Sequence, residues 1–168
     1  MPTQYQFGPL TIVALEDGTG PFFQPREQAF PTATAEHWQL ADALDPAATN
    51  AAGQWLEATD QLDLLGGETS LAAAVRVVPT PGHTPGHQSV LLANDGQEFA
   101  ITGDVLVHAV QLVDPRLPYA HDHDPATAQQ TRVRLLAELT GKGAVLATAH
   151  LGEPFLTPTA EGWLPPRR

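Results

Sequence analysis

The sequence contains no cysteine, which excludes disulfide bonds and thiolate chemistry. Any metal site must therefore be built from histidine and carboxylate ligands. Charged residues are also scarce, at 16% of the 168 residues, and most of them are acidic. There are 8 Lys and Arg residues and 19 Asp and Glu residues, which gives a net charge of −11. An acidic chain repels phosphate groups, so we expect neither nucleic acid nor an anionic membrane as a partner.

Long apolar runs are absent as well. No segment reaches the roughly 18 apolar residues of a membrane span. The first residues, Met1 to Phe7, show no basic region followed by an apolar stretch, so we expect no signal peptide and a cytoplasmic location. Hydrophobic residues make up 42% of the chain, enough for a packed core, and we predict one domain over residues 1–168.

The first 65 residues show weak patterns. We predict a strand over 10–15, a loop over 19–34, a helix over 35–44, a linker over 46–54, and a short helix or irregular segment over 55–65. The residues of the linker are small or polar throughout.

The remainder is more regular. We predict a strand over 73–78 that ends at the following prolines, and a hairpin of strands 88–93 and 98–102 around Asn94-Asp95-Gly96. Residues 105–113 are mostly apolar and predicted to be extended. A helix is expected from Pro125, with Asp124 as its N-cap and Gly141 as its end, followed by a buried strand over 144–149.

Three candidate metal ligands follow strand ends: His83, Asp104 and His150. A hairpin returns the chain to the edge it left, so His83 and Asp104 should share one rim of the sheet. If strand 144–149 joins by a crossover, His150 reaches the same rim. Two imidazoles and a carboxylate suit Zn, Mn or Fe.

Each candidate also has a purely structural explanation. His83 follows a Pro-Gly turn and has the position of a capping or surface residue. Asp104 follows Thr102-Gly103 and has the position of a turn cap, and His150 that of a core histidine. The common topology favours a shared site, although spacing alone does not establish one.

Three segments in order resemble the metallo-β-lactamase superfamily: residues 78–90 (VPTPGHTPGHQSV), 102–104 (TGD) and 147–151 (ATAHL). The resemblance covers residues 65–157, and Leu15 to Gly18 is similar to the opening of lactonase-like and organophosphate-hydrolase-like members. It implies an α/β (α+β) fold, an αββα sandwich with one or two metal ions at one edge. It also implies that His83 is a ligand of the first metal, that Asp104 bridges both, that His150 belongs to the second, and that His87 is structural.

One diagnostic motif of that family, His-x-His-x-Asp-His, is missing. No histidine lies between His37 and His83, which indicates an internal deletion near residues 46–55. Residues 1–54 then represent a remnant of the N-terminal half, and residues 55–168 the C-terminal half. The segment His121-Asp122-His123-Asp124 is a conceivable substitute, but it lies where the family has an acidic loop, and we interpret its histidines as incidental. His108 is a candidate pocket residue, and His37 is predicted on a solvated helix surface.

The resemblance implies a metal-dependent hydrolase of esters, lactones or phosphoesters that acts on a small molecule, with His83 and Asp104 as catalytic residues. Without the missing ligands we expect weak metal binding and weak or absent turnover. Two alternatives remain open: a non-catalytic binding or scaffold protein, and an abbreviated form of a longer enzyme. Loss of half the sandwich would bare an inner sheet face. We expect the segment with Phe22, Phe23 and Phe30 to cover it, or a second copy to do so in a homodimer.

Overall fold

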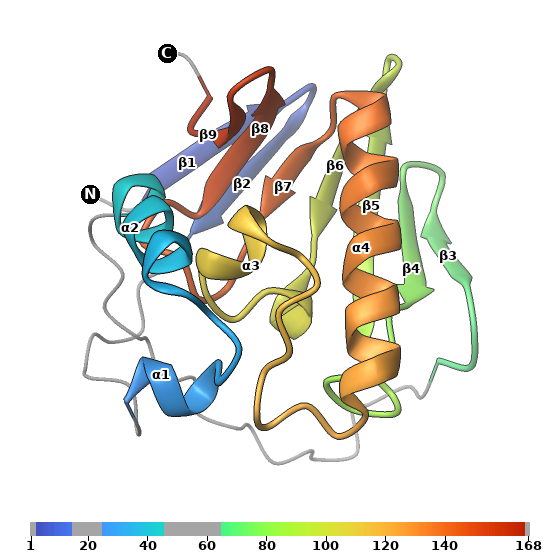
Figure 1. Ribbon diagram of the computed structural model, residues 1–168. Helices are drawn as coiled ribbons and strands as arrows, with labels where there is room; N and C mark the ends of the chain where they lie inside the picture. The colour runs from blue at the N-terminus through green and yellow to red at the C-terminus, as the bar shows by residue number, and fades with distance from the viewer. Residues whose placement is uncertain (1–2, 15–24, 46–64, 167–168) are drawn as a thin grey trace.

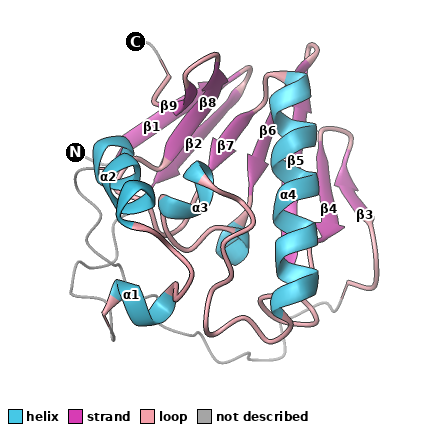
Figure 2. Cartoon of the chain, in the orientation of Figure 1, coloured by secondary structure: helices cyan, strands magenta, loops and turns pink. Residues whose placement is uncertain are grey.

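The structure is a computed structural model that describes residues 3–14, 25–45 and 65–166. These residues form three layers (Figure 1). A large sheet lies in the middle, helices cover its front face, and a two-stranded hairpin lies behind it (Figure 2). The predicted mixed α/β architecture is confirmed.

The large sheet contains seven strands in the order of the chain, and only β6 and β7 run parallel. Its strands are β3 Thr69–Ala72, β4 Val75–Pro79, β5 Gln88–Asn94, β6 Gln97–Ile101, β7 Val145–Ala147, β8 Phe155–Thr159 and β9 Gly162–Leu164. The turn between β5 and β6 places Asp95 at φ 47° and Gly96 at φ 78°, which is the positive-φ pair that a two-residue hairpin requires. The predicted hairpin is confirmed.

The second sheet consists of β1 Thr3–Phe7 and β2 Leu10–Ala14, which pair antiparallel. It packs on the rear face of the large sheet through a cluster of aromatic and aliphatic side chains. Tyr5 and Phe7 contact Phe99, and Tyr5 also contacts Phe155. This hairpin therefore covers part of the inner face that the sequence predicted to be bare. Phe22, Phe23 and the predicted linker lie outside the described residues.

Helices pack on the opposite face. They are α1 Arg26–Ala29, α2 Ala35–Leu44, the 3-10 turn η1 Gly103–Val105, α3 Val110–Val113 and α4 Pro125–Lys142. Leu135, Leu136 and Leu139 of α4 pack over Leu91, Ala100 and Leu146 of the sheet. Phe30 is buried in this helix-side core, so the expectation that it covers the inner sheet face is wrong.

Two predicted elements differ in the structure. Residues 105–113 are not extended: His108 Nδ1 accepts the N–H of Val110, and Gln111 Oε1 accepts the N–H of Val107. These side chains satisfy amides that a strand would have paired, and η1 and α3 form instead. Helix α4 also passes through Gly141 and ends at Lys142. The cap is Gly143, whose φ of 62° allows its N–H to reach the carbonyls of Leu139 and Thr140.

The loop expected over 19–34 is only partly present. Its described part, residues 25–34, contains the short helix α1. Strands β1, β3, β8 and β9 were not predicted. Among the described residues, no helix is both long enough and apolar enough to cross a membrane.

Candidate metal centre

The three predicted ligands meet at one edge of the large sheet. His83 Nε2 lies 3.3 Å from Oδ2 of Asp104, and His150 Nε2 lies 2.8 Å from Oδ1 of the same carboxylate. The side chain of Asp104 thus lies between two imidazole rings, with a different oxygen facing each ring. All three side chains are partly exposed, between 19% and 33%. The site is therefore accessible from solvent.

Strand topology explains this meeting. His83 lies in the turn between the antiparallel strands β4 and β5, and Asp104 follows β6, the hairpin partner of β5. Because β7 is parallel to β6, its carboxyl end reaches the same edge, where His150 follows it. The predicted hairpin and crossover are both present, and they bring together the residues that the sequence singled out.

Buried hydroxyl groups connect the strand ends beneath the site. Thr80, Ser89 and Thr102 are each at most 3% exposed. Thr80 Oγ1 lies 2.9 Å from Ser89 Oγ, and Thr102 Oγ1 donates to the carbonyl of Ala147 at 3.2 Å. These bonds join β4, β5, β6 and β7 at the edge that carries the site, which gives the ligands a rigid support.

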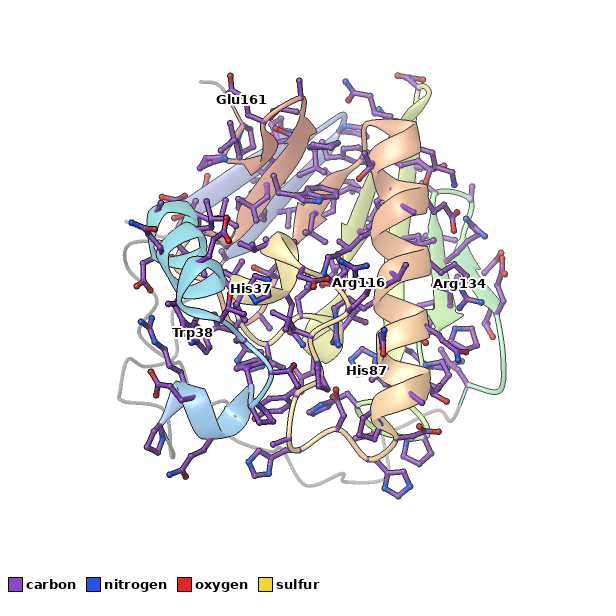
Figure 3. All side chains as sticks on the ribbon, in the orientation of Figure 1. His37, Trp38, His87, Arg116, Arg134 and Glu161 are labelled. Atoms are coloured by element: carbon purple, nitrogen blue, oxygen red, sulfur yellow. The ribbon has the colours of Figure 1, made fainter. Side chains whose placement is uncertain are left out.

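His87 belongs to this support. Its Nε2 accepts the backbone N–H of Asp104 at 3.0 Å, and its Nδ1 lies 2.8 Å from Thr80 Oγ1 and 3.0 Å from the Thr80 carbonyl. Since Nε2 is an acceptor, the ring proton is on Nδ1, and burial lowers the pKa of His87, in agreement with a neutral ring. This arrangement agrees with a structural role for His87. Figure 3 shows His87 beside the N-terminal part of α4.

The turn that carries His83 is docked onto α4. Thr131 Oγ1 donates to the carbonyl of Pro81 at 2.8 Å. Gly82 has φ 134°, and a Cβ at this position would lie 2.2 Å from the backbone nitrogen of Ala128. Only glycine fits between the turn and the helix. A small hollow beside His83 and Asp104 is bordered by Thr131 and Arg132 of the same helix.

His83 contacts a second carboxylate, which the sequence did not predict. Its Nδ1 lies 3.1 Å from Oδ1 of Asp122, while its Nε2 faces Asp104. Asp104 and Asp122 together raise the pKa of His83 to about 9 despite its partial burial. The ring of Tyr119 stacks on His83, with 6.0 Å between centroids and 23° between planes.

Charges in the site shift two other groups. His150 and His83 lower the pKa of Asp104 well below its usual range, so this carboxylate is ionised at neutral pH. Burial, with the negative charges of Asp122 and Asp104, raises the pKa of Tyr119 to about 12. Tyr119 is consequently a neutral phenol.

The other histidines lie elsewhere. His108 is 6% exposed and packs edge-on against Phe30 and Trp38 in the helix-side core, so it does not line the site as the sequence suggested. His37 exchanges capping hydrogen bonds with Thr34 at the start of α2. His121 and His123 are exposed. It is Asp122 between them that reaches His83.

The donors at this edge are two imidazole nitrogens and a carboxylate, which are typical ligands of zinc. His83 Nε2 lies 3.3 Å from Asp104 Oδ2. His150 is closer, at hydrogen-bond distance from Asp104. In the described ranges, no group of three or more His, Asp or Glu side chains is arranged as a metal cage. Thus the donor types would suit zinc, and His83, Asp104 and His150 are the residues that would hold it.

A comparison with protein families agrees with this fold and site. The model of the metallo-beta-lactamase superfamily matches residues 19–150. That range includes most of the chain and all three residues of the site, and the chain belongs to this superfamily. A search of curated proteins finds no match.

Solved structures of the same fold are similar to part of the chain. The hydrolase AbOPH of the beta-lactamase superfamily is 30% identical, with a TM-score of 0.51 over 58% of this chain and 36% of that chain. The dizinc quorum-quenching lactonase AidC is 24% identical, with a TM-score of 0.51 over 60% and 36%. A probable metal-dependent hydrolase from Staphylococcus aureus is 13% identical, with a TM-score of 0.56 over 65% and 41%. The matched region thus spans only about two fifths or less of these proteins.

Proposed function

We propose that this chain is a metal-dependent hydrolase of reduced size, with its reaction centre at His83, Asp104 and His150. One observation carries the proposal: a single ionised carboxylate lies between two imidazole Nε2 atoms at a solvent-accessible sheet edge. Strongly shifted pKa values, such as those of His83 and Asp104, cluster at reaction centres. The same three residues would hold one or two ions, of which zinc is our first choice and manganese or iron the others.

When bound, a divalent ion supplies Lewis-acid activation of water and of the scissile carbonyl or phosphoryl oxygen. The protein's own groups prepare the site. Asp104 keeps its carboxylate ionised, and His87 fixes the backbone from which that carboxylate projects. His83 must release a proton before its Nε2 can act as a ligand, because its pKa lies near 9.

Weak activity is part of the proposal. The sequence lacks the His-x-His-x-Asp-His motif that the superfamily resemblance implies, so most of the expected ligands are missing. His83 and His150 face two different oxygens of Asp104, and the three side chains are not arranged as a metal cage in the described residues. A misplacement of about 1 Å reduces rates on the order of a hundredfold.

Small molecules with a hydrolysable bond are the proposed substrates. The superfamily resemblance implies esters, lactones and phosphoesters, and these are the three classes to test first; AbOPH is described as a hydrolase and AidC as a lactonase. A chain with a net charge of −11 favours neutral or cationic molecules over polyanions.

Zinc titration by calorimetry tests the metal site. Wild-type protein should bind zinc, and His83→Ala, Asp104→Ala and His150→Ala should each weaken binding at least tenfold. His123→Ala is the matched control, because it removes an exposed histidine from the same region. Binding that is unchanged in all three variants would refute the assignment.

Turnover of the three substrate classes separates the enzyme from the non-catalytic alternative. The proposed enzyme shows slow zinc-dependent hydrolysis that Asp104→Ala abolishes. A binding or scaffold protein would bind zinc with no turnover above the Asp104→Ala background.

A further inference from the structure

The segment His121-Asp122-His123-Asp124 places a carboxylate in the protein interior. The side chain of Asp122 is 1% exposed. Its Oδ1 contacts His83 Nδ1 at 3.1 Å, whereas its Oδ2 is buried with no hydrogen-bond partner among the described residues. A buried carboxylate that is only half satisfied is unfavourable for folding, so its position calls for a functional explanation.

Backbone hydrogen bonds fasten this segment to the turn that carries His83. The N–H of His123 donates to the carbonyl of His83 at 3.1 Å, and the N–H of Asp124 donates to the carbonyl of Gly82 at 2.9 Å. Asp124 in turn caps α4, accepting the N–H of Thr127 at 3.1 Å and its hydroxyl at 2.7 Å. Asp122 is therefore held at a defined place relative to His83 by both the turn and the helix.

The ring of His83 is constrained on three sides. Asp122 contacts Nδ1, Asp104 contacts Nε2, and Tyr119 stacks on the ring face. A flip of the ring would turn a carbon atom toward the buried carboxylate and break that ion pair. The contact with Asp122 thus determines which nitrogen faces the sheet edge where Asp104 and His150 lie.

We propose that Asp122 is the positioning residue of His83: its buried carboxylate accepts the Nδ1–H and keeps the Nε2 lone pair directed to the metal site. This inference rests on the proposed function, which makes Nε2 a ligand. A carboxylate behind a ligating imidazole orients the ring and raises its basicity. Removing such a partner commonly weakens metal binding about 10- to 100-fold.

The proposal also gives a use to the motif that resembled a set of ligands. His121 and His123 are exposed, and Asp124 is the helix cap. Asp122 is the member of this segment whose side chain contacts His83. The motif therefore supports a ligand instead of supplying one.

Two variants and a matched control test this role. Asp122→Asn keeps the shape and removes the charge, and Asp122→Ala removes the carboxylate. Asp124→Asn removes a charge two residues away and leaves a good N-cap. Zinc affinity by calorimetry should fall about 10- to 100-fold for Asp122→Asn and stay within about twofold for Asp124→Asn.

A second measurement needs no zinc. In protein treated with a chelator, the Nδ1 proton of His83 should give a hydrogen-bonded, downfield proton resonance in wild type and Asp124→Asn. This resonance should be lost in Asp122→Ala and shifted upfield in Asp122→Asn. If the alanine variant does not fold, Asp122→Asn is used for both the zinc titration and the resonance. His83→Gln assigns the resonance.

The outcomes separate the two proposals. If wild type binds zinc and Asp122→Asn binds it equally well, the positioning role is wrong and the proposed metal function stands. If wild type binds no zinc, the metal function is wrong, and the resonance alone decides whether Asp122 orients His83. A resonance that is unchanged in Asp122→Ala overturns the inference in either case.

Discussion

His87 accepts the backbone N–H of Asp104 through Nε2 at 3.0 Å, which joins the Pro-Gly-His turn to the residue at the middle of the site. The approach is close enough that a Cβ on Gly103 would lie 3.0 Å from the same nitrogen, and Gly103 has φ 51°. The imidazole nitrogen therefore accepts the N–H of Asp104 in place of the carbonyl oxygen that a neighbouring strand would have offered if β6 had continued. Both ring nitrogens are occupied by this structural role.

His87→Ala should consequently destabilise the fold and loosen the site together. It leaves the Asp104 N–H and the Thr80 carbonyl without their side-chain partner and opens a cavity, so we expect a loss of about 2–3 kcal/mol in the free energy of unfolding. Urea denaturation measures it. His123→Ala, an exposed position, should change stability by less than about 0.5 kcal/mol. Equal stability of the two variants would show that the His87 contact is dispensable.

The pKa of His83 predicts how stability depends on pH in protein kept with a chelator. The folded-state pKa of about 9 exceeds the ordinary value of 6.5, so folding favours the protonated ring. The stabilisation is fully present below pH 6.5 and disappears as pH rises to about 9. The difference between 6.5 and 9 corresponds to at most about 3.5 kcal/mol, at roughly 1.4 kcal/mol per pKa unit, and solvent screening of this partly exposed ring reduces the loss.

Denaturation at a series of pH values measures this loss, and His83→Gln is the control, since it has no proton to lose at this position. Zinc affinity should rise over the same interval because zinc must displace that proton. A wild-type stability profile parallel to that of His83→Gln would contradict the prediction.

Local chemistry explains which parts of the fold the sequence predicted. Asp124-Pro125 starts α4 and the Asp95-Gly96 turn joins β5 to β6, because caps and turns depend on a few adjacent residues. The meeting of His83, Asp104 and His150 was predictable for a related reason. One hairpin and one crossover determine that three strand ends share an edge.

Long-range contacts explain what the sequence did not predict. Asp122 and His83 are 39 residues apart, and no pattern in the chain links them. Their contact depends on the path of residues 105–119, whose backbone is satisfied by side chains such as Gln111 and Arg132. The mostly apolar sequence of 105–113 is compatible with a strand, but tertiary hydrogen bonds favour the turn and short helix that form instead.

The homodimer remains a prediction, which light scattering can test.

Gly82→Ala should disrupt the docking of the His83 turn on α4. The new Cβ would meet the Ala128 backbone at 2.2–2.3 Å, and the φ of 134° is unfavourable for any side chain. We expect a loss of about 3 kcal/mol or more, seen as a fall of roughly 6–12 °C in Tm, together with weaker zinc binding. Gly86→Ala is the matched control in the same turn, since nothing lies within 4 Å of a Cβ there. A wild-type Tm for Gly82→Ala would mean that the turn is not held against the helix.

Arg132 supports the path of the loop that follows Asp104. It is 1% exposed, and its guanidinium donates to the carbonyls of Pro115, Val105 and Leu117 at 2.9, 3.1 and 3.0 Å. Among the described residues, no carboxylate forms an ion pair with Arg132. Burial lowers its pKa and the negative charge of Asp122 partly offsets this shift, so the three carbonyls supply the direct contacts that compensate for its desolvation.

Arg132→Met preserves much of the volume but leaves all three carbonyls without a donor. We expect a loss of about 3–5 kcal/mol in the free energy of unfolding. Arg134→Met is the control, because Arg134 is an exposed residue of the same helix (Figure 3) and should change stability by less than about 0.5 kcal/mol. Arg132→Lys separates charge from geometry: an ammonium cannot match the planar fork that reaches three carbonyls in different directions, so this variant should recover only part of the loss. Full recovery with lysine would show that the positive charge, rather than the three directed bonds, supports the loop next to Asp104.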